Sequence, residues 1–327
     1  MSARYELIGL TASPYSMKIR ALLRYRRIPF DWIVEMPQLT GRKLAVSPIL
    51  LPVLRHPMGR DMTDSTSIAL MLEREIVNDR NVMPGGDRDF LCHLIEDMAD
   101  EWLTKVMFWY RWRDESSAGF GADWIASEVS AALPGQRTDA LAASLRKRQQ
   151  GRMPMIGATE VNGPLLAATF RAVLGALRPA IMTDGYLFGS RPSLADFALF
   201  GQLSQLGSDP GPAAIMREDS PEVLHWLRRI DDASGVEGVW SGSLSNLEGL
   251  LRIVGGDYLP FLVANADAVA AGRELVEMDL ASGRFRNTAY RWQANCLSRL
   301  RDLYASSDLD AGTREMLDRT GCTQYLE

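Results

Sequence analysis

Residues 5–35 read YELIGLTASPYSMKIRALLRYRRIPFDWIVE, and this stretch decides the fold of the N-terminal part of the chain. Residues 5–11 are mostly apolar, which favours a strand buried on both faces. A helix should follow directly, because Ser13 is a good N-cap and Pro14 is pre-organised for the first helical position. Residues 30–35 predict a second strand, so the stretch forms a β-α-β unit with room for a right-handed crossover.

The residues that follow complete a small α/β unit. Residues 41–46 predict a short helical piece, and residues 50–55 and 58–62 predict two strands around a turn. A third helix begins near Ser65, where apolar residues start to repeat every four positions. Residues 78–89 are rich in Asn, Asp, Pro and Gly, which is typical of a linker. The first part of the chain is therefore βαβ followed by ββα.

Beyond the linker the sequence changes to long helical periodicity with few strand signals. We therefore expect two domains, an α/β domain at residues 1–80 and a larger all-α domain at residues 88–327. Residues 240–327 form an extended C-terminal tail of the second domain. The length of 327 residues fits this division. The expected helices cover residues 90–113, 122–132, 138–150, 164–181, 193–203, 221–232, 258–278, 289–304 and 311–318.

The composition is that of an ordinary globular chain, with 46% hydrophobic and 24% charged residues. A net charge of −5 and an isoelectric point near 5.4 argue against broad affinity for nucleic acid or anionic membranes. The first residues lack a long apolar core, and no stretch of about 18 residues or more is free of charges. We therefore expect neither a nucleic-acid partner nor a membrane association.

The three cysteines, Cys92, Cys296 and Cys322, are odd in number and form no C-x-x-C pair. This pattern favours neither a disulfide framework nor a zinc site, and it indicates a reducing compartment. The three histidines share no metal-ligand spacing with the cysteines or with one another. We therefore expect a cytoplasmic protein without a metal.

Four local patterns follow one another along the chain: SPYS at 13–16, LPVL at 51–54, DSTSI at 64–68 and GSRPSLADF at 189–197. Together they resemble the glutathione S-transferase superfamily, in a serine-type and bacterial-like form, over residues 5–235. The resemblance implies a thioredoxin-like N-terminal domain that binds glutathione. It also implies an all-helical C-terminal domain that supplies the pocket for a second substrate. The extended C-terminal tail lies outside the resemblance and inherits no meaning from it.

Ser13 carries the chemistry in this interpretation. The helix behind it presents unpaired N–H groups and roughly half a positive charge, which favours a thiolate over a thiol. A hydroxyl here can donate a hydrogen bond to the glutathione sulfur and lower the pKa of the thiol. Ser16 and Thr11 are alternative hydroxyls, and Ser13 could also serve only as a helix cap. Glutaredoxin-like and some transferase relatives place cysteine in this segment, so serine at both ends argues against cysteine-based thiol reduction.

The resemblance also implies how the rest of glutathione is held. Pro52 corresponds to a cis-proline, and the backbone of Leu51 would pair with the cysteinyl part; a trans-proline at a strand start is the alternative. Asp64 and Ser65 would hold the γ-glutamyl end, Asp64 either directly or across a dimer interface, or both residues only cap the third helix. Arg42 and Lys43 are candidates for the glycyl carboxylate, although a solvated loop is equally consistent with them. The full predicted glutathione-binding set is Ser16, Arg42, Lys43, Leu51, Pro52, Asp64 and Ser65.

An aromatic and cationic segment, FWYRWR at 108–113, is a candidate surface for an aromatic or anionic second substrate. Its consecutive aromatic residues cannot share one helical face, so part of the segment belongs to the core. The residues we predict for the substrate pocket are Tyr15, Trp109, Tyr110 and Arg113.

These expectations lead to a hypothesis about function. The chain would be a homodimeric glutathione transferase that activates the thiol for attack on a small hydrophobic or aromatic electrophile. Two rivals remain open. One is a non-catalytic binding or scaffold protein on the same fold, and the other is a glutathione-dependent isomerase or lyase that regenerates glutathione.

Overall fold

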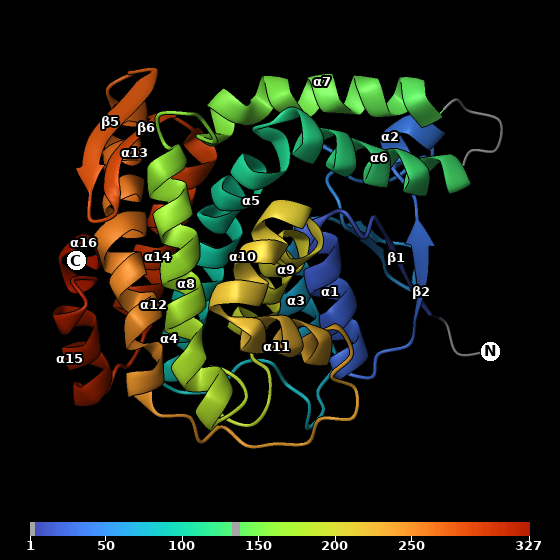
Figure 1. Ribbon diagram of the computed structural model, residues 1–327. Coiled ribbons are helices and arrows are strands. Elements are labelled where there is room, and N and C mark those ends of the chain that lie inside the picture. The colour runs from blue at the N-terminus through green and yellow to red at the C-terminus, as the bar shows by residue number, and fades with distance from the viewer. Residues whose placement is uncertain (1–3, 133–137) are drawn as a thin grey trace.

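The computed structural model describes residues 4–132 and 138–327. Its N-terminal part is a sheet with the strand order β2-β1-β3-β4, in which β1 and β2 are parallel and the other neighbours are antiparallel (Figure 1). Helix α1 connects β1 to β2, and α3 follows β4, so the predicted order βαβ-ββα is confirmed. The elements are β1 (Tyr5–Gly9), α1 (Pro14–Tyr25), β2 (Phe30–Val34), α2 (Pro37–Thr40), β3 (Val53–Arg55), β4 (Asp61–Met62) and α3 (Ser65–Glu75).

The short helix predicted at residues 41–46 is wrong. The structure places α2 earlier, at Pro37–Thr40, and residues 41–46 form neither helix nor strand. Pro37 is the first helical residue, where a missing N–H is not needed. Gly41 ends the helix with a φ of 75°, a left-handed conformation that glycine adopts without strain. Proline at the start and glycine at the end therefore mark this helix.

The C-terminal part is largely helical, as expected. Instead of one helix over residues 90–113 there are two, α4 and α5, which meet at Trp102. Helix α10 was not predicted, although Pro210 marks its start. The helices are α4 (Arg88–Glu101), α5 (Leu103–Trp112), α6 (Glu115–Ala132), α7 (Thr138–Ile156), α8 (Gly163–Thr183), α9 (Leu194–Ser208), α10 (Pro210–Asp219), α11 (Pro221–Asp231), α12 (Glu248–Ile253), α13 (Leu259–Ala270), α14 (Arg291–Ser306), α15 (Ala311–Arg319) and α16 (Thr323–Leu326), with a 3-10 turn at Leu244–Leu247 and a π-helical turn at Val254–Tyr258.

The expectation that the second domain is entirely helical is wrong at one place in the tail. Strands β5 (Leu275–Leu280) and β6 (Gly283–Thr288) form an antiparallel hairpin. The helix predicted over residues 258–278 ends at Ala270, and Gly272 follows with a φ of 66°. Val276 and Leu280 are buried while their neighbours are more exposed, so burial follows the period of two that is typical of a strand. Over six residues this period is hard to tell from a helical one in the sequence.

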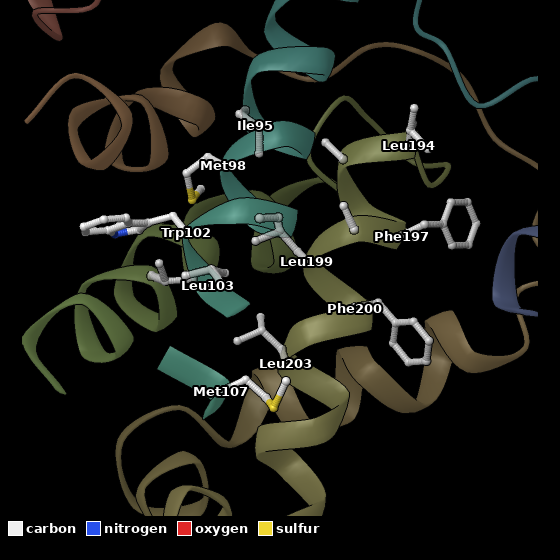
Figure 2. Close-up of a cluster of buried hydrophobic side chains, with 14 of the residues drawn as sticks. Ile95, Met98, Trp102, Leu103, Met107, Leu194, Phe197, Leu199, Phe200 and Leu203 are labelled. Atoms are coloured by element: carbon white, nitrogen blue, oxygen red, sulfur yellow. The ribbon is translucent and has the colours of Figure 1, made fainter. Parts of the chain in front are cut away.

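The core of the C-terminal part lies between α4 and α9, where apolar side chains from both helices interlock (Figure 2). Met98, Leu199 and Leu203 are among its fully buried members. Among the described residues, α8 is the one helix long and apolar enough to cross a membrane by length and composition. Half of that apolar window is buried inside the protein.

The elements line up in one direction across the molecule (Figure 1). The sheet lies on one side, α4, α5, α8 and α9 lie in the middle, and the tail from α12 to α16 lies on the other side. Helices α6 and α7 pack side by side along one edge, and α6 also touches β2. The helical hairpin α6–α7 is therefore in contact with the N-terminal sheet.

Candidate functional site

Ser13 caps α1, as the sequence predicts. Its backbone is extended, and its hydroxyl oxygen accepts a hydrogen bond from the Ser16 N–H over 3.3 Å. The Ser13 side chain is half-buried. Among the residues that the structure describes, no acceptor takes the hydrogen of this hydroxyl. Ser13 therefore keeps a hydrogen-bond donor in front of the first turn of α1.

The two alternative hydroxyls have other surroundings. Ser16 is fully buried, and its side chain lies directly against Gly9. The Thr11 hydroxyl donates to the Glu128 carboxylate and accepts from the indole N–H of Trp124 over 3.0 Å. The hydroxyl hydrogen of Thr11 is thus already in use.

Glu128, from α6, also binds the backbone of the turn before α1. Its carboxylate accepts the Thr11 N–H over 2.9 Å and the Ala12 N–H over 3.4 Å. The carbonyls of the same two residues accept from Gln205 and Arg111, each over 3.1 Å. The C-terminal part therefore clamps both peptide groups of this turn. None of these contacts was predicted, because they join residues about a hundred positions or more apart.

Arg111 is held by a further ion pair. Its guanidinium lies 2.9 Å from the Asp209 carboxylate, and both side chains are almost fully buried. Burial raises the pKa of Asp209, while the guanidinium acts in the opposite direction. The pair fixes the group that holds the Ala12 carbonyl.

The loop before β3 has the feature that the resemblance implies. The Leu51–Pro52 peptide bond is cis. The Thr63 hydroxyl donates to the Leu50 carbonyl over 2.8 Å and closes this loop. Within the described part of the chain, the Leu51 N–H has no acceptor.

Asp64 caps α3 with its carboxylate, which accepts the Ser67 N–H over 2.7 Å. Its φ of 73° is unusual for a residue with a side chain. The hydroxyl of Ser65 turns inward, 3.4 Å from an Asp100 oxygen and 3.5 Å from the Lys18 ammonium. The first residue of α3 is therefore tied to the interior.

Lys18, Glu96 and Asp100 form a buried charge cluster between α1 and α4. The Lys18 ammonium is 2.6 Å from Asp100 and also pairs with Glu96. Burial alone would lower the pKa of Lys18, but the two carboxylates outweigh it and raise that pKa. Burial raises the pKa of Asp100 to about 7, although Lys18 opposes this. The sequence carried a signal for this cluster, because Lys18 lies on the buried stripe of α1 between Tyr15 and Leu22.

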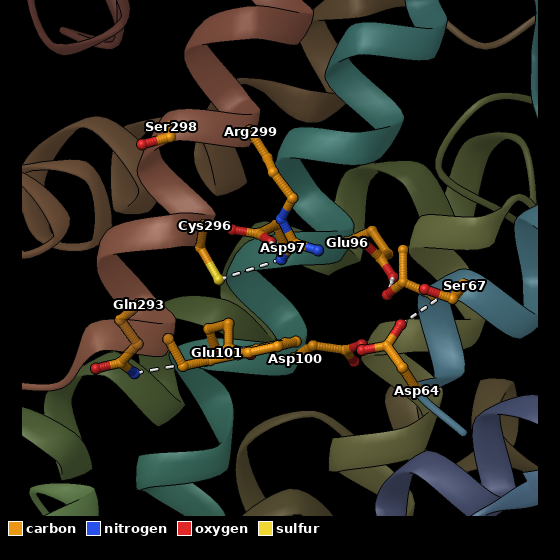
Figure 3. A network of polar contacts seen from close by, with 12 residues as sticks. Asp64, Ser67, Glu96, Asp97, Asp100, Glu101, Gln293, Cys296, Ser298 and Arg299 are labelled. Atoms are coloured by element: carbon orange, nitrogen blue, oxygen red, sulfur yellow. Dashed lines mark hydrogen bonds and ion pairs between the residues drawn. The ribbon is translucent and has the colours of Figure 1, made fainter. Parts of the chain in front are cut away.

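The polar cluster continues along α4 to the tail helix α14 (Figure 3). The Tyr258 hydroxyl donates to Asp97, and the Trp292 indole donates to Glu101 over 2.8 Å. Arg299 lies 3.8 Å from Asp97. Burial and the carboxylate of Glu101 raise the pKa of Asp97 to about 8. The tail therefore covers a row of acidic side chains on α4.

The two predicted cations for the glycyl carboxylate differ in availability. The Arg42 guanidinium lies 2.7 Å from Glu35 and 3.7 Å from Glu6. Lys43 is exposed, and no described residue pairs with its ammonium. Lys43 is thus the cation of this loop that a ligand can reach without breaking an ion pair.

The predicted substrate-pocket residues are not brought together on an open surface. Trp109 and Tyr110 lie in the core, and Arg113 stacks over both rings from outside. The Tyr15 hydroxyl bonds to the Asp100 carbonyl and to Thr104. Consecutive aromatic residues on one helix became core, which is the alternative that the helical period favoured.

A different aromatic pair lines a cavity next to the turn before α1. Phe120 and Trp124, both from α6, line a cavity of about 470 Å³ that is open to solvent, together with Asp123, Ser127 and Ser208. Their ring centroids are 6.2 Å apart, and the Arg111 guanidinium lies over Trp124. The sequence signal was the spacing of four between the two rings, which places them on one helical face.

A thioredoxin-like sheet with a serine at the start of its first helix, joined to a helical domain, defines a protein of the glutathione-transferase class. Sequence profiles agree: the glutathione S-transferase N-terminal domain matches residues 7–78, and the glutathione S-transferase C-terminal domain matches residues 129–229. The chain belongs to the glutathione S-transferase superfamily. No curated protein matches it at a significant level.

Several solved structures are similar to the chain. A glutathione S-transferase from Rhodospirillum rubrum is 16% identical, covers 76% of this chain and 91% of its own, and has a TM-score of 0.43. One from Methylobacterium radiotolerans, in complex with glutathione sulfonate, is 21% identical, with coverages of 74% and 97% and a TM-score of 0.43. The beta-etherase LigF from a Sphingobium strain is 19% identical, with coverages of 69% and 94% and a TM-score of 0.47.

Proposed function

We propose that the protein is a glutathione transferase in which the Ser13 hydroxyl stabilises the thiolate of glutathione. The observation that carries this proposal is the free hydrogen of that hydroxyl, since Ser16 is sealed in the core and Thr11 already donates to Glu128. A donor beside the positive end of a helix favours the charged form of a thiol. The thiolate is the nucleophile that the protein itself does not supply.

The remaining contacts of glutathione follow from the same site. The Leu51 N–H is available to pair with the cysteinyl carbonyl. Asp64 and the start of α3 would hold the γ-glutamyl end, and Lys43 rather than Arg42 would meet the glycyl carboxylate, because Arg42 is already paired. Ser65 would support α3 from inside through Asp100 and Lys18, and would not bind the ligand in its present orientation.

We place the second substrate in the cavity beside Phe120 and Trp124. This depression is open to solvent, and the Trp124 indole that lines it reaches the turn before Ser13 through Thr11. Two tilted rings favour a planar, aromatic electrophile. If this placement is right, Phe120→Ala raises KM for an activated aryl halide severalfold and leaves KM for glutathione nearly unchanged.

The first experiment compares Ser13→Ala with Ser16→Ala and Thr11→Val. We expect Ser13→Ala to lower turnover of an activated aryl halide about 100-fold, the usual loss for one donor at a developing charge. The other two variants should lose far less. Calorimetric titration with glutathione measures binding in each variant. Equal turnover in Ser13→Ala would contradict the role of this hydroxyl, and absence of glutathione binding in the unmodified protein would favour a scaffold function.

Other parts of the hypothesis are proposals of the same kind. Mass spectrometry of the products distinguishes a transferase, which leaves glutathione attached, from a lyase or isomerase, which returns it. A homodimer is proposed by analogy with the superfamily and is checked by sedimentation. A cytoplasmic location and the domain division at residues 1–80 and 88–327 are likewise proposed, and limited proteolysis in the linker tests the division.

A further inference from the structure

The turn between β1 and α1 offers two successive backbone N–H groups to an anion. The Ser13 N–H is used by the Leu10 carbonyl over 3.1 Å, and Pro14 has no N–H. The N–H groups of Thr11 and Ala12 are therefore the last donors before the cap of α1. Such neighbouring N–H groups bind anions, and the positive end of the helix adds to the attraction.

An anion of the protein already occupies these donors. The Glu128 carboxylate accepts both N–H groups and the Thr11 hydroxyl. No lysine, arginine or histidine in residues 4–132 or 138–327 forms an ion pair with Glu128. Arg111, which reaches the same turn, is paired with Asp209. The direct contacts of the Glu128 carboxylate among the described residues are therefore hydrogen bonds and not ion pairs.

We propose that Glu128 is a tethered anion that competes with the glutathione thiolate for the positive potential at the start of α1. The proposal rests on the proposed function, because Ser13 directly follows the two donors that Glu128 holds. Two negative charges at one helix terminus disfavour each other, so the carboxylate opposes the stabilisation of the thiolate by Ser13 and raises the pKa of the bound thiol. Glu128 is thus a positioning residue on α6 that limits how much thiolate forms.

The charge of Glu128 can be removed almost without changing its shape. Glu128→Gln keeps one oxygen that can accept the same N–H groups, and the comparison is made in a Thr11→Val background because the amide does not replace both acceptors of the carboxylate. Asp139→Asn removes a carboxylate from an exposed position on α7 of the same helical hairpin. The measured quantity is the apparent pKa of the thiol in the glutathione complex, followed by the ultraviolet absorbance of the thiolate. We expect Glu128→Gln to lower the apparent pKa of the thiol by about one pH unit. At a pH below the pKa of both proteins, this corresponds to about tenfold more thiolate.

A second variant covers the case in which Glu128→Gln does not fold. Glu128→Asp keeps the charge and shortens its reach by one methylene, so the thiol pKa should lie between those of the unmodified protein and Glu128→Gln. Asp139→Asn should match the unmodified protein. A thiol pKa that is unchanged or higher in both Glu128 variants would overturn this proposal and leave the transferase function standing. If neither the variants nor the unmodified protein bind glutathione, both the role of Glu128 and the transferase function are overturned.

Discussion

Helices α1 and α3 begin in the same local way but face different surroundings. Each is capped by a side-chain oxygen that accepts the N–H three residues later, from Ser16 to Ser13 and from Ser67 to Asp64. The start of α1 faces the carboxylate of Glu128, which accepts hydrogen bonds but has no ion-pair partner among the described residues. The residue that opens α3, Ser65, instead turns toward a buried ammonium. Caps with the same hydrogen-bond pattern thus have different electrostatic surroundings, because α6 supplies a carboxylate near the start of α1 whereas Lys18 of α1 supplies an ammonium near the start of α3.

The two surroundings also differ in how their charges are paired. Behind α3, Lys18 lies between two carboxylates and is fully buried. In front of α1, Arg111 is paired with a single buried carboxylate and also holds the Ala12 carbonyl. Removing one member of a buried pair leaves an uncompensated charge, which costs far more than the pair contributes. Loss of the buried cation behind α3 should therefore destabilise the protein more than loss of the cation in front of α1.

Lys18→Met tests the larger of the two effects. It leaves Glu96 and Asp100 buried without their cation, so we expect the free energy of unfolding to fall by about 4–5 kcal/mol in chemical denaturation. Lys147→Met, at an exposed position on α7, controls for the loss of a lysine. Adding Glu96→Gln and Asp100→Asn to Lys18→Met should restore much of the loss. A Lys18→Met protein as stable as the control would show that the cluster is not a coupled buried unit.

Arg111→Met breaks the corresponding pair on the α1 side. It leaves only Asp209 buried without a cation, and it also frees the Ala12 carbonyl, so we expect a loss of about 3 kcal/mol. The double variant Arg111→Met with Asp209→Asn should lose less free energy of unfolding than Arg111→Met alone. If Arg111→Met proves more costly than Lys18→Met, the ranking of the two sides is incorrect.

These differences explain which parts could be predicted from the sequence. The βαβ-ββα order and the caps at Ser13 and Asp64 depend on residues within a few positions of one another, and their patterns are local. The clamp by Glu128 joins residues 117 positions apart, and no local pattern encodes it. Phe120 carries a weaker local signal than the aromatic segment at 108–113, although aromatic residues at consecutive positions of a helix belong largely to the core.

The hairpin β5–β6 was missed for a different reason. Apolar residues at 275, 276, 278 and 280 fit a helical period as well as a strand over so short a window. The glycines that bound the two strands were the better signal, since Gly272 and Gly283 both adopt positive φ. At this place in the tail the turn residues therefore carried more information than the hydrophobic periodicity, which sufficed for α14 and α15.

The acidic row that the tail covers gives a pH-dependent test. Burial and Glu101 raise the pKa of Asp97 to about 8 in the folded protein, above its ordinary value near 3.8. Between these values the folded protein holds a proton that the unfolded chain has released, so the free energy of unfolding falls as the pH rises. Asp97→Asn cannot titrate, so it should gain at least about 1 kcal/mol relative to the unmodified protein between about pH 5 and about pH 8. Denaturation curves at both pH values measure this, with Asp139→Asn as the exposed control. An equal slope in Asp97→Asn would mean that Asp97 is ionised in the folded state.

The smallest effect separates the two caps themselves. Ser13 has a φ of −107°, which any residue adopts, whereas Asp64 has a φ of 73°, which favours glycine. Alanine and glycine both remove the capping side chain, but only glycine tolerates positive φ without strain. The stability advantage of Asp64→Gly over Asp64→Ala should therefore exceed that of Ser13→Gly over Ser13→Ala by about 1 kcal/mol. Thermal denaturation of the four variants measures the two differences. If the difference between the glycine and alanine variants is the same at both caps, residue 64 leaves its left-handed backbone conformation once the carboxylate is removed. The capping hydrogen bond alone would then hold that conformation.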